Sequence, residues 1–105
     1  MNRPFRTEPE ASAELENAAV WYESRRPGLG VEFLEAVDAT LDRISRWPQA
    51  ARRVPAVSTD VPARTAPVSR FPYYIAYLET PSAIRILAFA HDSREPGYWY
   101  PRVKK

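Results

Sequence analysis

The sequence has no cysteine, and His91 is the only histidine among its 105 residues. Neither a disulfide framework nor a thiolate metal site can therefore form, and a single imidazole cannot build a histidine cluster. We expect neither a metal nor any other cofactor in this protein.

Long apolar runs are also absent. No segment approaches the roughly twenty consecutive apolar residues that a bilayer-spanning helix needs, and residues 1–10 carry arginines without the apolar stretch of a secretory signal. We therefore expect a cytoplasmic protein. Hydrophobic residues make up 45% and charged residues 27% of the chain, which is typical of a globular protein, and the length predicts one domain over residues 1–105.

The charged residues are divided unevenly between the two halves of the chain. Residues 1–42 carry four basic and nine acidic side chains, whereas residues 43–105 carry eleven basic and four acidic ones, so the net charges are −5 and +7. Such a division favours a partner that recognises the basic half, either nucleic acid or an acidic protein segment. A solvated surface on which the charges happen to segregate is the alternative.

The first half of the chain predicts a short strand over residues 3–7 and then a helix that begins near Pro9. Basic residues, a proline and a glycine in Arg25-Arg26-Pro27-Gly28 end this helix, because they suit the negative end of its dipole and a left-handed turn. Four apolar residues spaced by three and four positions form its inner face, namely Ala11, Leu15, Ala18 and Tyr22.

A second helix is predicted after a tight loop that runs through Gly30, and Pro48 stops it. Because so few residues separate the two helices, we expect an antiparallel helical hairpin that covers an apolar surface. The inner face of the second helix is predicted to consist of Leu34, Val37, Leu41 and Ile44.

The second half of the chain predicts strands. Residues 48–63 are rich in proline and alanine and indicate an exposed connection, with an extended piece around residues 54–57. Alternating patterns predict strands over residues 64–69, 73–78 and 84–90, the last two joined as a hairpin. Pro67 cannot donate to a sheet ladder, so it implies an edge or a bulge.

The expected fold is therefore an α+β domain, in which the helical hairpin packs on a mainly antiparallel sheet of three or four strands. Simple alternation along residues 84–91 assigns Ile84, Ile86, Ala88 and Ala90 to the face under the helices. The opposite face, with Arg85, Leu87, Phe89 and His91, is then expected to stay open for a ligand.

Four pieces of the sequence, in this order, resemble the RelE/ParE superfamily toxins of type II toxin–antitoxin systems. Each piece alone is a weak signal, but together they cover nearly the whole chain, and the ParE-like, plasmid stabilisation type is the most similar. The pieces are Trp21-Tyr22, Gly28-Leu29-Gly30 with Phe33-Leu34, Arg70-Phe71-Pro72-Tyr73-Tyr74-Ile75-Ala76-Tyr77, and His91-x-x-Arg94-x-Pro96-x-x-Trp99-x-x-Arg102.

The resemblance implies a toxin that forms a hetero-oligomer with a cognate antitoxin, which neutralises it, and that poisons DNA gyrase or replication. An inactive member that only binds its antitoxin is one alternative. Arginine forks set among aromatic rings suit binding to a macromolecule. The residues predicted to bind the target are Arg64, Arg70, Arg94, Tyr98, Trp99 and Arg102, and those predicted to bind the antitoxin are Arg85, Leu87 and Phe89.

Other members of the superfamily cut messenger RNA on the ribosome, so an endoribonuclease is a second alternative. Such cleavage needs a group that accepts the 2′-hydroxyl proton, cations that hold the phosphate, and a donor for the leaving oxygen. Under this alternative His91 and Tyr98 would exchange protons, and the phosphate would be held by Arg64, Arg70 and Arg85.

Two departures from the cutting members weaken the enzymatic interpretation. The only lysines are Lys104 and Lys105, so the lysine-rich centre of those members is missing. His91 is followed by Asp92 instead of the terminal tyrosine found in some of them. We therefore favour a protein that acts by binding and not by breaking bonds.

Overall fold

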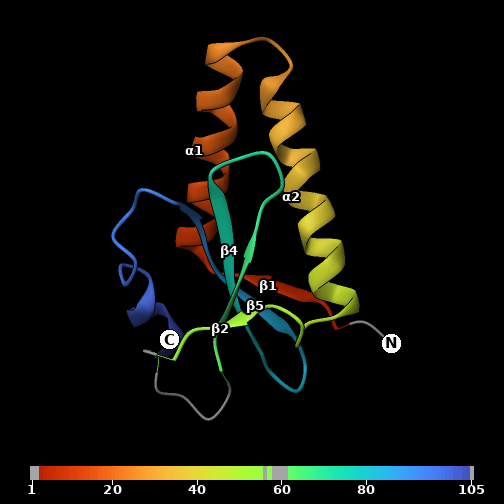
Figure 1. Ribbon diagram of the computed structural model, residues 1–105, viewed down its shortest axis with the longest axis vertical. Coiled ribbons are helices and arrows are strands. Elements are labelled where there is room, and N and C mark those ends of the chain that lie inside the picture. The colour runs from red at the N-terminus through yellow and green to blue at the C-terminus, as the bar shows by residue number, and fades with distance from the viewer. Residues whose placement is uncertain (1–2, 56, 58–61, 105) are drawn as a thin grey trace.

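The computed structural model describes residues 3–55, 57 and 62–104 (Figure 1). In chain order the elements are β1 (Phe5–Thr7), α1 (Pro9–Arg25), α2 (Leu29–Arg46), β2 (Arg52–Arg53), β3 (Arg64–Pro67), β4 (Tyr73–Glu79), β5 (Ile84–His91) and a 3-10 helix, η1 (Tyr100–Lys104). Within this part of the chain, none of the helices has the length and apolar character needed to span a bilayer.

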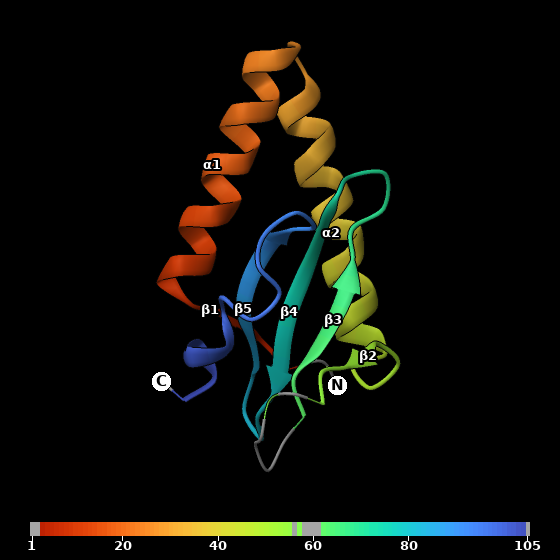
Figure 2. The ribbon, with the colours of Figure 1, turned by 60° about the vertical axis from the view of Figure 1, so that its left-hand side comes forward.

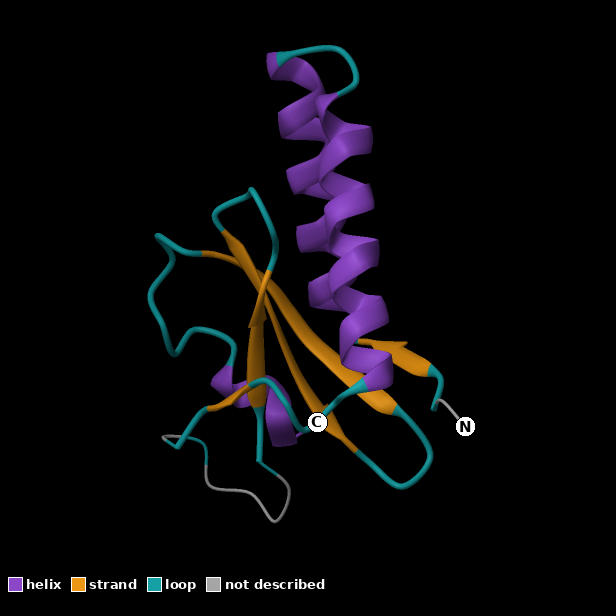
Figure 3. Cartoon of the chain, turned by 45° about the vertical axis from the view of Figure 1, so that its right-hand side comes forward, coloured by secondary structure: helices purple, strands orange, loops and turns teal. Residues whose placement is uncertain are grey.

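The two helices form a hairpin that packs on one face of a five-stranded sheet, and the tip of the hairpin projects beyond the sheet (Figures 1 and 3). The strand order is β1-β5-β4-β3-β2, and all neighbours are antiparallel except β1 and β5. This arrangement confirms the predicted α+β class. The sheet has more strands than the three or four expected because the two-residue β2 joins it.

The hairpin turn is shorter than the sequence predicted. Gly28 has a φ of 88°, a left-handed conformation that a glycine adopts without strain, and α2 begins at the next residue. Gly30 therefore lies in the first turn of α2 and not in the loop. The Glu23 carboxylate on α1 accepts hydrogen bonds from the backbone N–H groups of Gly28 and Gly30, both at 3.0 Å, and so caps α2.

The helices and the sheet enclose one hydrophobic cluster, here called the helix-side core. Its buried residues are Ala11, Ala18, Tyr22, Phe33, Ala36, Val37, Ile44, Ala66, Val68, Ile75, Tyr77, Ile84, Ile86 and Phe89. The prediction for Leu34 is wrong, because this side chain is 39% exposed and the adjacent Phe33 is fully buried. Leu41 packs against the cluster but is only partly buried. A spacing of three and four residues along α2 fits an inner face that includes either Leu34 or Phe33. The large Phe33 ring takes the buried position, and Leu34 is left at the surface.

A β-bulge interrupts the alternation of β5. Ala76 pairs with Ala88 and Tyr77 pairs with Ile86, so Leu87 is an extra residue on β5. Because of the extra residue, side chains after the bulge point to the opposite face from the one that alternation predicts. Phe89 therefore lies in the helix-side core. The predicted facing is therefore correct at Ile84 and Ile86 and wrong from Ala88 onward.

The second face of the sheet is not open, which corrects another expectation. A second cluster, the outer core, consists of Ala63, Ala76, Leu78, Leu87, Ala88, Ala90, Trp99 and Val103. Trp99 is 1% exposed, and its indole N–H donates to the Tyr74 hydroxyl at 3.0 Å. The segment that leads into η1 covers this face (Figure 2).

The sheet edge at β3 is partly closed. β2 pairs with Arg64 and Thr65 only, so Pro67 lies where β3 has no outer neighbour, as the sequence predicted. The carbonyl oxygen of Pro67 accepts a hydrogen bond from Arg43 at 3.3 Å. The extended piece expected around residues 54–57 is instead found at Arg52–Arg53, and residue 56 lies outside the described residues.

We predict that Gly30→Ala destabilises the protein by about 1–3 kcal/mol, the usual cost of overpacking. A Cβ atom at this position would lie 2.7 Å from the backbone oxygen of Ala19, so the two helices would have to separate. Urea unfolding measures the change. Val31→Ala, at an exposed neighbouring position, is the matched control and should have little effect. Equal stability of the two variants would contradict the close approach of the helices.

The second prediction concerns alkaline pH. Burial raises the pKa of Tyr77 to about 12, and the nearby Arg64 charge lowers it by less. The ordinary pKa is 10.0, so between these values the folded state keeps a proton that the unfolded chain has lost. Stability from this group is complete below pH 10 and is lost as the pH rises towards 12.

Tyr77→Phe should therefore flatten the decline of the unfolding free energy between pH 10 and 12. It should also lower stability at neutral pH, because the Tyr77 hydroxyl donates to the Pro48 carbonyl at 2.6 Å. Urea titrations at fixed pH values test both effects. An unchanged alkaline slope would show that Tyr77 does not contribute to it.

Candidate functional site

The candidate site is a group of charged and polar side chains between α1 and the C-terminal segment. Glu14 of α1 and Arg102 of η1 form a two-pronged ion pair, with Nη1 at 3.0 Å from Oε1 and Nη2 at 3.1 Å from Oε2. Their side chains are only 17% and 14% exposed. This geometry is the one in which a guanidinium holds a carboxylate most firmly.

Three elements meet at the Glu14 carboxylate. Oε1 also accepts the backbone N–H of Phe89 in β5 at 3.1 Å, and Oε2 accepts the hydroxyl of Tyr98 at 2.8 Å. Arg102 in turn donates to the backbone carbonyl of Leu87 at 2.9 Å. We call Glu14, Tyr98 and Arg102 the Glu14 network. It fastens the C-terminal segment to both α1 and the sheet.

Proton affinities in the network follow from these contacts. Burial raises the pKa of Tyr98 well above its ordinary value, and the hydrogen bond to Glu14 and the charge of Glu14 raise it further. For Arg102, burial acts to lower the pKa, but the hydrogen bond and the charge of Glu14 outweigh it and raise the pKa. At neutral pH Tyr98 is therefore a neutral donor and Arg102 a fixed cation.

Arg94 stands at the edge of the network. Its guanidinium carbon lies 3.9 Å from the centre of the Tyr98 ring, a close cation–π contact. The residue is exposed, and no described carboxylate forms an ion pair with it. Tyr98 thus holds a cation at the surface without neutralising it.

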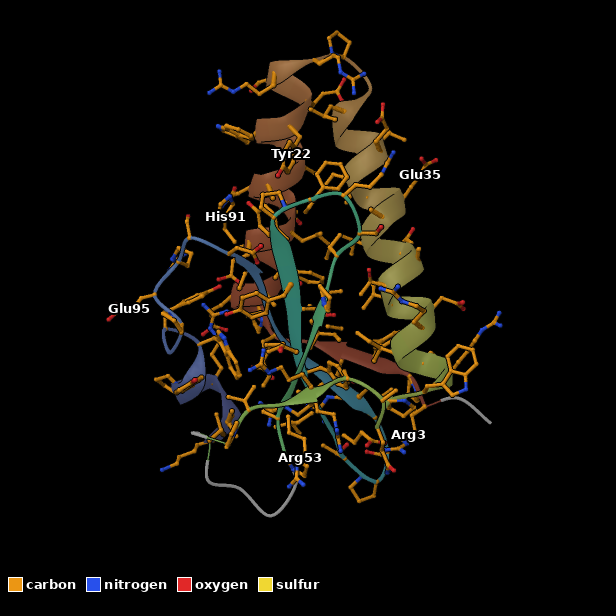
Figure 4. All side chains as sticks on the ribbon, in the orientation of Figure 1. Arg3, Tyr22, Glu35, Arg53, His91 and Glu95 are labelled. Atoms are coloured by element: carbon orange, nitrogen blue, oxygen red, sulfur yellow. The ribbon has the colours of Figure 1, made fainter. Side chains whose placement is uncertain are left out.

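A groove of about 430 Å³ lies beside the network, between α1 and the adjoining ends of β4 and β5. Its aromatic lining comes from Trp21, Tyr22, Tyr73 and Phe89, and its polar lining from Glu14, Asn17, His91, Ser93 and Arg94. Tyr22 of α1 and His91 of β5, both labelled in Figure 4, belong to this lining. An apolar wall with a cation at its rim suits an amphipathic protein segment.

His91 is held in place locally. Its Nδ1 accepts the backbone N–H of Ser93 at 3.0 Å and lies 2.7 Å from the Ser93 hydroxyl. The ring packs edge-on against Tyr73, with 5.0 Å between the ring centres. Within the part of the chain that the structure describes, no three acidic or histidine side chains are grouped as metal ligands would be.

The six residues predicted to bind the target do not form one surface. Arg64 begins β3 and donates to the Ala51 carbonyl at 2.9 Å, whereas Arg70 lies beyond the other end of β3, exposed and with a φ of 71°. Trp99 is buried, and Arg102 is engaged by Glu14. Arg94, Tyr98 and Arg102 lie together beside the groove, because both guanidinium groups contact the Tyr98 ring.

The residues predicted to bind the antitoxin do not share a face. Arg85 pairs with Glu8 at 3.0 Å and donates to the Arg102 and Val103 carbonyls. Leu87 is buried in the outer core and Phe89 in the helix-side core. The bulge and the C-terminal segment account for this correction, since neither follows from simple alternation.

Sequence reasoning missed Glu14 and the groove. The uneven charge division was the available signal, because acidic residues of the first half pair with basic residues of the second. Glu8 binds Arg85 and Glu14 binds Arg102. Part of the division therefore serves the fold itself.

Comparisons with known proteins give one kind of match. No family model matches the sequence, and no curated protein matches it. The fold is similar to a chain of a solved structure described as a chromosomal ParDE toxin–antitoxin system from P. aeruginosa, with a TM-score of 0.68 and 18% sequence identity. The match covers 85% of this chain and 95% of that one.

We predict that Glu14→Ala destabilises the protein by about 1–3 kcal/mol, because it leaves the partly buried Arg102 guanidinium without its partner. The double variant Glu14→Ala with Arg102→Ala should lose less than the sum of the single changes. Arg46→Ala is the control, since its pair with Asp42 is 60% exposed on both sides, and exposed pairs contribute about 0–1 kcal/mol. Chemical denaturation measures all four variants, and additive losses would contradict the coupling.

Proposed function

We propose that this chain is the toxin of a type II toxin–antitoxin pair, a ParE-like poison of DNA gyrase or replication that a cognate antitoxin neutralises. The observation that carries the proposal is the similarity of fold, at a TM-score of 0.68, to a chain of a ParDE toxin–antitoxin system over 85% of this protein. The order of the four sequence pieces from Trp21 to Arg102 supports the same assignment.

The groove beside α1 is the proposed antitoxin site. Its aromatic wall of Trp21, Tyr22 and Phe89 offers apolar surface, and Arg94 offers an exposed cation. An antitoxin tail with alternating apolar and acidic residues would cover both and become ordered as it binds. The toxin and its antitoxin would then form a hetero-oligomer.

Arg94, stacked on Tyr98, is the proposed contact with the target. A guanidinium held against an aromatic ring is already ordered, so little entropy is lost when it binds a carboxylate or phosphate. The same residue faces the proposed antitoxin groove. Neutralisation is then explained by competition for Arg94. Gyrase is a cytoplasmic enzyme, so we propose that the protein acts in the cytoplasm.

Three observations favour a binding poison over a messenger RNA endoribonuclease. The Tyr98 hydroxyl donates to Glu14 and has a raised pKa, so at neutral pH it stays protonated and is a weak acid. His91 directs Nδ1 towards Ser93. The candidate residues Arg64, which begins β3, and Arg70, which follows the other end of that strand, do not sit side by side as a phosphate-holding pair would.

Three assays separate the candidate functions. The purified chain is added to a gyrase supercoiling reaction and, separately, to a ribosomal translation reaction. Its expression is also tested in cells with and without the adjacent gene, which we expect to encode the antitoxin. Inhibition of supercoiling alone, with growth rescued by the adjacent gene, is the expected result. Cleavage of ribosome-bound message would establish the endoribonuclease. Tolerated expression together with tight antitoxin binding would establish an inactive member.

We predict that Arg94→Ala abolishes toxicity while the protein stays folded, because the exposed side chain contributes to binding and not to the core. His91→Ala should change toxicity little, since no proton transfer is required. Arg46→Ala is the control for loss of an exposed arginine. Growth after induction gives toxicity, and circular dichroism gives folding. The proposal would be overturned if His91→Ala abolished toxicity while Arg94→Ala remained toxic.

A further inference from the structure

A second cavity, of about 350 Å³, lies between the end of α2 and the edge formed by β2 and β3. Most of its wall is apolar, and Ile44, Trp47, Ala66 and Pro67 contribute to this apolar surface. Two basic residues, Arg43 and Arg52, also line the cavity. Trp47 is 60% exposed, although it is one of the largest apolar side chains in the protein. The volume is within the usual range of small-molecule sites, roughly 300–1,000 Å³.

The guanidinium groups of Arg43 and Arg52 have N–H donors that strong hydrogen bonds do not occupy. Arg43 makes only long contacts, at 3.4 Å with the Thr40 hydroxyl and 3.3 Å with the Pro67 carbonyl. For Arg52, no side-chain hydrogen bond or ion pair is formed with any residue that the structure describes. Acidic residues are likewise missing from the described lining of the cavity. The cavity therefore combines an apolar interior with uncompensated positive charge.

The other polar groups of the lining restrict the class of ligand. The Tyr77 hydroxyl is occupied by the Pro48 carbonyl at 2.6 Å, which leaves Thr65 as the main neutral polar side chain in the wall. A sugar or a nucleobase would lose its hydration here without gaining enough hydrogen bonds in return. A hydrocarbon or aromatic body has no such cost, and it would cover the Trp47 indole.

We propose that this cavity binds a small organic monoanion with an apolar body, of the class of a medium-chain fatty acid. The carboxylate lies between Arg43 and Arg52, where each guanidinium offers charge-assisted hydrogen bonds. The apolar body lies against Trp47 and Ile44. This site shares no lining residue with the groove beside α1, and the proposal does not depend on the toxin assignment.

Decanoate, used below its micelle-forming concentration, is the test ligand. It is titrated into the purified 105-residue chain in a calorimeter, and tryptophan fluorescence is followed in parallel. We expect saturable binding of one decanoate per chain. 1-Decanol, which has the same chain length without the charge, should bind at least about tenfold more weakly, the loss expected for a charge-assisted hydrogen bond.

Substitutions locate the site. Arg52→Ala should weaken decanoate binding about tenfold. Arg53→Ala is the matched control, because Arg53 is the next residue of the same strand, is equally exposed, and does not line the cavity. Ala50→Phe, at an exposed position on the rim, should fill the cavity and abolish binding. Circular dichroism checks that each variant is folded.

Four results would overturn the proposal. One is the absence of saturable decanoate binding up to millimolar concentration. Another is an equal loss of affinity in Arg52→Ala and Arg53→Ala, which would mean that decanoate binds to general positive charge. The third is displacement of decanoate by adenosine monophosphate, which would show that the cavity accepts a polar nucleotide. Binding that survives Ala50→Phe would likewise place the ligand elsewhere.

Discussion

The arrangement of the C-terminal half depends on the partly buried ion pair between Glu14 and Arg102. Glu14 accepts four hydrogen bonds, two of them from Arg102 and one each from Phe89 and Tyr98. Burial of either charge alone would cost several kcal/mol, so each group is retained only while the others stay in place. The pair thereby holds the segment that places Trp99 in the outer core. It also fixes Tyr98, whose ring carries Arg94 at the surface.

The ion pairs show that the uneven charge division is not entirely available to partners. Glu8 with Arg85 and Glu14 with Arg102 each join the acidic half to the basic half, and so part of the division is satisfied inside the molecule. The arginines available to partners are those that pair with no described carboxylate and are exposed. They include Arg43, Arg52, Arg53, Arg70 and Arg94. Net charge alone therefore overstates how much of the basic half can face a ligand.

Sequence periodicity was sufficient for the helices and the central hairpin, because their side-chain spacing reflects one buried face. It could not choose between Leu34 and Phe33, since both fit the spacing of α2. The extra residue at Leu87 depends on how β4 pairs with β5, a tertiary property that no local pattern contains. The candidate site was harder to predict, because Glu14 and Arg102 are 88 residues apart in the sequence. The sequence also gives no sign that Trp99 is buried in the outer core, so it resembled an exposed binding residue.

The groove and the second cavity are built from different parts of the fold. The groove is lined by α1, the adjoining ends of β4 and β5 and the residues that follow β5, whereas the cavity lies among α2, β2 and β3. A protein partner in the groove and a small anion in the cavity would not compete for the same side chains. The helix-side core lies between the two sites: Tyr22, which lines the groove, packs against Phe33, and the same core contains Ile44 and Tyr77, which line the cavity. A change in the packing of this core would therefore be felt at both sites, because closely packed interiors transmit strain.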